Sequence, residues 1–259
     1  MEALLLGAVQ GVTEFLPISS SAHLLIVSWL LDGQTLPLAL NIALHIGTLS
    51  AVLFYFWRDW LRLCQTSWSL ASRRAVPDED KHLLFGIFVG SLPAGFLGIL
   101  FHKEIEAIFH QSPFTSVAPL AFFGVLLWWV DKKAPERLTL NHLTWKQAFW
   151  IGCTQAIALI PGSSRSGMTI TGGRWLGFQR ADATRFSFLL GTPAMGGAAL
   201  LQSKQLMEHI LDPTFVVGVL SSLIVGLLSI HLLLSYVRRF GFLPFAIYRV
   251  ILAIVLYSI

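Results

Sequence analysis

Apolar stretches long enough to cross a lipid bilayer constrain the fold of this chain more than any other feature. A helix needs about 20 consecutive, mostly apolar residues to span the hydrocarbon core. We predict that six stretches do so: 38–57, 83–101, 114–130, 181–201, 213–236 and 243–257. With 55% hydrophobic and 12% charged residues, the chain also lies outside the usual range of soluble proteins. The sequence therefore predicts an all-α integral membrane protein.

Two further pairs of apolar segments are too short to span and are interrupted by polar turns. The first pair covers residues 1–31 and turns at Pro17, and the second covers residues 147–176 and turns at Pro161. Proline ends a helix because it lacks an amide hydrogen and its ring clashes with the preceding turn. Irregular backbone at membrane depth is tolerated only where protein or a water-filled cavity surrounds it. We therefore predict two re-entrant helical hairpins that turn inside the membrane.

The two halves of the chain share one layout, a hairpin followed by three spans. An offset of 144 residues aligns the Pro-x-Ser-Ser turn at Pro17 with the turn at Pro161, and it also aligns a Gly-Thr pair in the span that follows each. Because each half has an odd number of crossings, the second half should be inverted relative to the first. We predict one membrane domain over residues 1–259, with repeats at about 1–131 and 145–259.

Basic residues gather in alternate connections between the predicted spans. The positive-inside rule assigns such connections to the cytoplasm. Both termini then lie outside, the hairpins enter from opposite sides, and their polar turns meet near the midplane. The residues that set this orientation are Arg58, Arg62, Arg73, Arg74, Lys81, Lys132, Lys133, Arg137, Lys146, Arg238 and Arg239, together with the region of Arg174, Arg180 and Arg185.

The polar turn within residues 159–173 places an arginine inside a protein built to sit in lipid. The planar guanidinium of Arg165 matches two phosphate oxygens, and the free amides at a helix start also bind anions. A buried charge is expensive in a membrane and usually marks function. We interpret this turn as a phosphate cradle. The alternative is a structural helix break in which Arg165 pairs with a buried acid.

If the two turns meet, they enclose an acid, an imidazole, an arginine and several hydroxyls in one pocket. Such a pocket suits phosphoryl transfer, because Arg165 and amides neutralise the phosphate oxygens while a hydroxyl or water attacks. Glu14 or His23 would then move the proton. The other polar side chains of this predicted pocket are Gln10, Ser19, Ser20, Ser21, Ser163, Ser164, Ser166 and Thr169.

Each of these side chains also has a structural interpretation. Glu14 could serve only as the ion-pair partner of Arg165, and His23 and Gln10 could be structural hydrogen-bonding groups. Single serines in membrane helices often bond back to their own backbone. Asn41 and His45 share a helix face. They could line the pocket or pack in the core.

Two long motifs carry a family resemblance. QGVTEFLPISSSAH (Gln10 to His23) and PGSSRSGMT (Pro161 to Thr169) closely resemble the signatures of the bacterial undecaprenyl-diphosphatase family, BacA/UppP. The similarity extends over almost the whole chain, through His45 to Phe56, Phe186 to Met195 and Phe242 to Arg249.

The resemblance implies an inner-membrane phosphatase that cleaves undecaprenyl diphosphate to undecaprenyl phosphate and inorganic phosphate, which recycles the lipid carrier of peptidoglycan synthesis. It also implies a site that opens to the periplasm, bacitracin resistance through competition for the same lipid, and a divalent cation, Mg²⁺ or Ca²⁺. The site of that cation is unassigned, with Glu14 as a candidate ligand.

The resemblance also assigns roles by motif position. Glu14 matches the essential acid, Ser20 the proposed nucleophile, His23 the family histidine and Arg165 the diphosphate-binding arginine. Gln10 departs from the pattern, because some members have glutamate there. This departure leaves Glu14 as the single acid and puts a mechanism with two carboxylates in doubt.

A transporter or flippase of a prenyl phosphate or another anion is the alternative function, because inverted repeats with interrupted helices are typical of carriers. A carrier needs no nucleophile, so the proximity of Glu14 and Ser20 favours chemistry. The expected partners are undecaprenyl diphosphate and membrane lipid, and a homodimer stays open. Nucleic acid is not expected, because the net charge of +4 is spread over loops rather than gathered in a basic tail.

Overall fold

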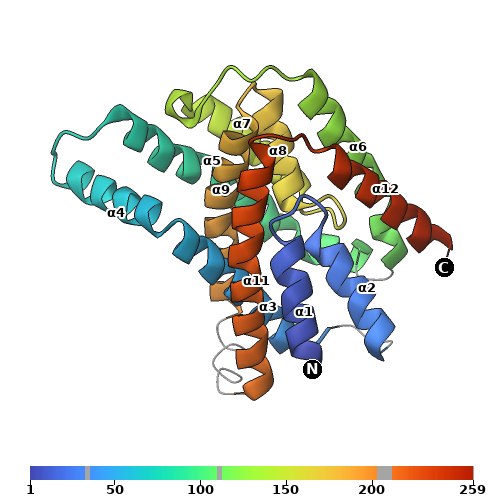
Figure 1. Cartoon of the computed structure of the whole chain (residues 1–259). Coiled ribbons are helices and arrows are strands. Elements are labelled where there is room, and N and C mark those ends of the chain that lie inside the picture. Colours follow the sequence, from blue (N-terminus) through green and yellow to red (C-terminus); the bar gives the residue numbers. More distant parts are fainter. Residues whose placement is uncertain (33–35, 110–112, 203–211, 259) are drawn as a thin grey trace.

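The computed structural model describes residues 1–32, 36–109, 113–202 and 212–258, which form helices and connecting loops (Figure 1). An isolated parallel bridge joins Leu138 to Phe178. The all-α prediction is therefore confirmed. The α-helices are α1 (Glu2–Thr13), α2 (Ser20–Asp32), α3 (Leu38–Tyr55), α4 (Trp57–Ala71), α5 (Asp78–Phe109), α6 (Val117–Lys133), α7 (Trp145–Ile157), α8 (Arg165–Trp175), α9 (Arg180–Leu201), α11 (Pro213–Val237) and α12 (Leu243–Ser258), and the 3-10 helices are η1 (Pro113–Ser116) and η2 (Leu140–His142).

Three of the six expected spans are long and apolar enough, by length and composition, to cross a membrane. They are α3, the Asp78–Phe101 part of α5, and α11. The other three expected spans correspond to α6, α9 and α12. Helices α6 and α12 have only 17 and 16 residues, and α9 carries charged side chains in its first turns. Crossing by these three helices stays a prediction.

The basic connection after α3 is largely helical. The predicted spans leave residues 58–82 as a polar connection, but α4 occupies much of it and α5 begins at Asp78. Apolar side chains recur at helical spacing among the charges, and Leu63 is buried on the face toward α5. Helices α4 and the start of α5 project together from the bundle (Figure 1). Helix α5 also continues to Phe109, through most of the second expected loop.

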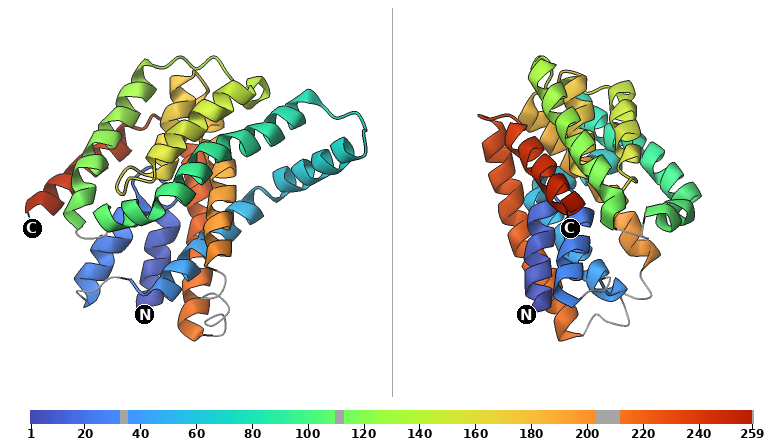
Figure 2. Two further views of the ribbon diagram at one scale, coloured as in Figure 1. Left: turned by 180° about the vertical axis from the view of Figure 1, so that it is seen from behind. Right: turned by 90° about the vertical axis from the view of Figure 1, so that its right-hand side faces the viewer.

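The two predicted hairpins are present as α1–α2 and α7–α8. They approach from opposite sides, and their turns lie side by side in the middle of the molecule in both orientations (Figures 1 and 2). Helix α1 packs against α11, and α7 packs against α5. The α5–α7 contact is close enough that a Cβ at Gly152 would overlap the backbone of Gly90. The inverted repeat itself, with its boundaries, stays a prediction.

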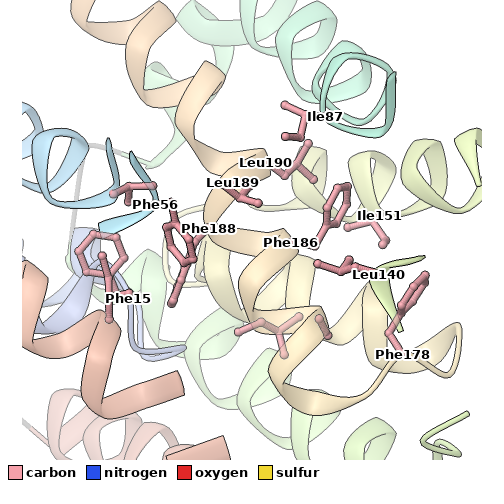
Figure 3. Close-up of a cluster of buried hydrophobic side chains, with 14 of the residues drawn as sticks. Phe15, Phe56, Ile87, Leu140, Ile151, Phe178, Phe186, Phe188, Leu189 and Leu190 are labelled. Carbon is pink, nitrogen blue, oxygen red and sulfur yellow. The ribbon is translucent and has the colours of Figure 1, made fainter. Parts of the chain in front are cut away.

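Several buried aromatic side chains pack together in the core next to the first hairpin turn. Phe15, next to Glu14, packs edge-on against Phe188 with ring centroids 5.3 Å apart, and Phe56 lies 6.4 Å from Phe188 (Figure 3). Phe15, Phe56 and Phe188 are all at most 5% exposed. Phe15 therefore joins the first turn to α9 within the apolar core.

A buried ionic network fixes the far end of the second hairpin. Arg174, which is fully buried at the end of α8, donates from Nε to Asp131 Oδ1 at 2.8 Å and from Nη1 to the carbonyl oxygen of Phe178 at 2.5 Å. Arg180 pairs with both Asp131 and Glu136. The charges are therefore compensated within the protein, which is the condition for burying them.

Candidate active site

The two hairpin turns share one unusual backbone feature. Ser19 and Ser164, each directly before the second helix of its hairpin, have φ of 75° and 71°. Residues other than glycine rarely adopt positive φ, and such strain clusters at functional sites. The hydroxyl contacts match as well, since Ser19 Oγ lies 3.2 Å from Ser21 Oγ and Ser164 Oγ lies 3.3 Å from Ser166 Oγ.

This equivalence shifts the sequence alignment of the turns by one residue. The 144-residue offset pairs Ser19 with Ser163, whereas the backbone pairs Ser19 with Ser164. The offset matches the serines that are identical in the two sequences. In the structure, the residue with positive φ directly precedes the second helix of each hairpin. As a result Ser20 and Arg165, the first residues of α2 and α8, hold equivalent positions.

Arg249 of α12 joins the two turns. Its side chain is fully buried and donates to five backbone carbonyls. Nη1 reaches Pro17 of the first turn at 3.2 Å, and Nη2 reaches Gly162 and Ser163 of the second at 2.9 and 3.0 Å. One guanidinium thus satisfies carbonyls that the broken helices leave free, which is necessary where water is scarce. Arg249 is not among the predicted site residues, although a lone arginine within an apolar span is a signal of function.

Glu14 is the centre of the polar contacts between the turns. Arg165 Nη2 donates to Oε1 at 2.7 Å, Ser20 Oγ donates to Oε2 at 2.6 Å, and Gln10 Nε2 donates to Oε2 at 3.0 Å. The carboxylate is 8% exposed. The predicted meeting of acid, hydroxyl and arginine is therefore observed, and the Glu14–Arg165 pair spans the two hairpins.

A pocket of about 260 Å³ opens beside this carboxylate. Both turns line it, together with α3, the end of α7 and the later part of α9. Of the predicted site residues, six lie in the lining: Glu14, Ser19, Ser20, Ser21, Ser164 and Arg165. The other lining residues are His45, Ala158, Ala194, Met195 and Ala198.

The remaining predicted residues surround the pocket without lining it. His23 is held behind the first turn, where Nδ1 lies 2.7 Å from the carbonyl oxygen of Ser19 and Nε2 lies 2.6 Å from the Tyr248 hydroxyl. Both ring nitrogens are thus engaged. The other four residues are buried and donate hydrogen bonds within the protein. Gln10 donates to the Glu14 carboxylate, and the hydroxyls of Ser163, Ser166 and Thr169 donate to the backbone carbonyls of Ile160, Leu16 and Arg165.

His45 supplies the imidazole that the pocket does contain. From sequence, His45 could either line the pocket or pack in the core, and the structure places it in the lining. Its Nδ1 lies 2.9 Å from the carbonyl oxygen of Asn41 in the preceding turn of α3. This bond orients the ring and leaves Nε2 for another partner.

The residues of the pocket do not fit a resident divalent cation. No cluster of three His, Cys, Asp or Glu that could hold a metal occurs within the described part of the chain. Both oxygens of Glu14, the candidate ligand, already accept hydrogen bonds, one of them from a guanidinium. A cation at Glu14 would share Oε1 with the Arg165 guanidinium and lie beside its positive charge.

Comparison with known proteins decides the family. The chain matches the model of the family described as bacitracin resistance protein BacA over residues 3–255. It belongs to the BacA family. Membership in the BacA family confirms the resemblance seen in the two motifs and makes the chain a multi-pass integral membrane protein.

Several BacA relatives align along their full length. The undecaprenyl-diphosphatase of Moorella thermoacetica is 42% identical, with 100% of this chain and 97% of the relative covered. That of Thermomicrobium roseum is 43% identical, with coverages of 98% and 96%. That of Chromohalobacter salexigens is 42% identical, with coverages of 97% and 95%.

Proposed function

We propose that this protein hydrolyses undecaprenyl diphosphate to undecaprenyl phosphate and inorganic phosphate in the pocket between the hairpin turns. The observation that carries the proposal is the contact of one carboxylate, Glu14, with both a hydroxyl and an arginine. The names of the relatives support the substrate, and the family description supports a link to bacitracin, which would compete for the same lipid. Release of the monophosphate would return the carrier lipid to cell-wall synthesis.

Ser20 is the nucleophile in this proposal. Its Oγ attacks the terminal phosphorus, the bond between that phosphorus and the bridging oxygen breaks, and undecaprenyl phosphate leaves. The hydroxyl proton passes to Glu14, which already accepts it in a 2.6 Å hydrogen bond. Water then attacks the phosphoserine, the bond between phosphorus and Ser20 Oγ breaks, and Glu14 returns its proton to Oγ while inorganic phosphate leaves with the protons of the water. The alternative is direct attack by a water that Glu14 activates.

Arg165 would stabilise the charge of the transferred phosphoryl group. Its Nη2 is bonded to Glu14, whereas its Nη1 is buried without a hydrogen-bond partner among the described residues. A buried donor without a partner is rare in proteins and suggests that a ligand supplies the acceptor. A phosphate oxygen at Nη1 would meet that need. The Ser19 and Ser164 turns offer hydroxyls and helix-start amides to the other oxygens.

The divalent cation implied by the family resemblance would arrive with the substrate. Magnesium is usually held by one or two carboxylates together with substrate phosphates and water, rather than by a protein cage. The diphosphate carries the negative charge that the protein does not offer. No step of the proposed mechanism passes through this ion.

We further propose that the protein lies in the bacterial inner membrane with both termini and the pocket on the periplasmic side. The support is the gathering of basic residues in alternate connections. Cysteine labelling of single-cysteine variants near residue 2 and in α4 of intact cells tests this orientation. Labelling at residue 2 and protection in α4 are expected, and the reverse pattern would overturn it.

Inorganic phosphate release from undecaprenyl diphosphate by the purified protein in detergent tests the function. The experiment compares wild type with Arg165→Ala, with and without Mg²⁺ or Ca²⁺. Release by the wild type that falls at least 100-fold in the variant is expected. No release from folded wild type would favour the carrier, in which the same pocket moves a prenyl phosphate without cleaving it.

A further inference from the structure

A second polar pocket, of about 480 Å³, lies where α3 meets α4. The first turns of α9 and the last turn of α11 complete its wall. Arg185, in this wall, precedes Met195 of the catalytic pocket by ten residues, or about 15 Å along α9. Phe56 and Phe188 pack between the two pockets. The second pocket is therefore separate from the proposed catalytic site.

Positive charge exceeds negative charge in this pocket. Arg185 pairs with Asp59, so these two charges compensate each other. Within the described chain, Arg58 and Arg238 have no acidic partner at ion-pair distance. Asp182, the other carboxylate in the lining, accepts a backbone hydrogen bond from Leu140. The lining thus holds three arginines against two aspartates.

The first turns of α4 and α9 in the pocket wall also favour binding of an anion. The first three residues of α4, including Arg58, and the second and third residues of α9 line the pocket. The amides of a first helical turn have no partner within the helix and favour negative charge. Guanidinium groups and such amides together are the usual ligands of phosphate.

The exposed tryptophan at the rim of the pocket favours a lipid headgroup as the anion. Trp57 is 52% exposed at the rim, and the Arg58 guanidinium lies 5.3 Å from the centroid of its ring. Exposed tryptophan at the end of an apolar helix is typical of the membrane interface. Basic pockets between membrane helices on the cytoplasmic side bind anionic headgroups. The pocket lies on the side where the basic connections gather.

We propose that this pocket binds the phosphate group of an anionic phospholipid of the inner leaflet. Arg58 and Arg238 would contact the phosphate oxygens, and Trp57 would lie at the level of the headgroup. The site takes a phosphate diester as a bound lipid and takes no part in the hydrolysis. It stands whether or not the proposed phosphatase reaction is correct.

The test measures binding of phosphatidylglycerol to the full-length protein. Purified protein in neutral detergent is titrated with short-chain phosphatidylglycerol, with phosphatidylcholine and with inorganic phosphate, and lipid binding is followed by native mass spectrometry and by thermal unfolding. A ligand that binds only the folded state raises Tm. We expect phosphatidylglycerol to bind and raise Tm, with little effect of the other two. Binding of inorganic phosphate without phosphatidylglycerol would overturn the lipid assignment.

Matched arginine variants locate the binding. Arg58→Gln/Arg238→Gln should weaken phosphatidylglycerol binding at least 10-fold, and the milder Arg238→Gln should weaken it several-fold if the double variant unfolds. Arg239→Gln removes the neighbouring exposed arginine, which does not line the pocket, and should bind like wild type. Arg165→Ala should also retain binding, which excludes the catalytic pocket as its location. Equal affinity in Arg238→Gln and Arg239→Gln, or no binding by wild type, would overturn the proposal.

Discussion

Ser20 Oγ donates a 2.6 Å hydrogen bond to Glu14 Oε2 across the turn that contains Pro17. The two residues are six positions apart and belong to different helical segments, so the broken helix is what brings them together. Arg165 Nη2 holds the other oxygen of the same carboxylate at 2.7 Å. The acid is thereby fixed toward the serine by a residue from the opposite hairpin.

Glu14→Gln tests the acid. The substitution keeps the shape of the side chain but removes the proton acceptor of Ser20 and the charge opposite Arg165. We expect the rate of phosphate release to fall by about 10²–10⁴-fold, the usual contribution of a general base. Glu2→Gln, at the exposed start of the same helix, is the matched control and should retain the rate. An active Glu14→Gln enzyme would exclude Glu14 as the base.

Gly191→Ala tests the placement of Arg165. A Cβ at Gly191 would overlap the Arg165 guanidinium, which must then move away from Glu14. Because misplacement of a catalytic group by about 1 Å can cost 100-fold in rate, phosphate release should fall at least 10-fold. The control is Gly197→Ala in the same helix, since a Cβ there meets no described atom within 4 Å. Equal rates for the two alanine variants would contradict this placement.

Arg249→Met tests the link between the turns. Loss of the guanidinium leaves buried carbonyls of both turns without donors, and a buried polar group left unsatisfied costs about 1–3 kcal/mol. Thermal unfolding in detergent should show a lower Tm than that of wild type. Arg249→Lys keeps the positive charge but has fewer hydrogen-bond donors, so its Tm should lie between those of Arg249→Met and wild type. An unchanged Tm in Arg249→Met would show that the turns do not depend on this residue.

His45 variants test whether this imidazole contacts the substrate. His45→Gln retains a hydrogen-bonding group in the pocket, whereas His45→Leu removes it. We expect KM to rise at least 10-fold in the leucine variant and less than 3-fold in the glutamine variant. His142→Leu, on an exposed 3-10 helix, should leave KM unchanged. A leucine variant with wild-type KM would place His45 among the packing residues.

The hairpins could be predicted from sequence because their determinants are local. Pro17 and Pro161 break apolar segments within a few residues of the polar side chains that define the turns, so the meeting of Glu14 and Arg165 followed from topology. Helix α4 was missed because its charges dominated the interpretation of residues 58–82. The apolar residues of α4 nevertheless recur at helical spacing.

The contacts by which α12 holds the two turns could not be predicted in the same way. Tyr248 reaches His23 across 225 positions of sequence, and Arg249 reaches Pro17 across 232. Neither pairing has a local signal, because it depends on how α12 packs beside the turns. For the same reason the sequence favoured His23 as the imidazole of the pocket, whereas the structure places His45 there.

The most direct test of the account compares Ser20→Ala with Ser21→Ala in phosphate release from undecaprenyl diphosphate. Both serines line the pocket, but Ser20 bonds to Glu14 whereas Ser21 Oγ lies beside Ser19 Oγ. We expect Ser20→Ala to lose at least 1000-fold in rate, whereas Ser21→Ala, with equal Tm, stays within about 10-fold of wild type. Full activity of folded Ser20→Ala would contradict the serine nucleophile and leave attack by a water that Glu14 activates.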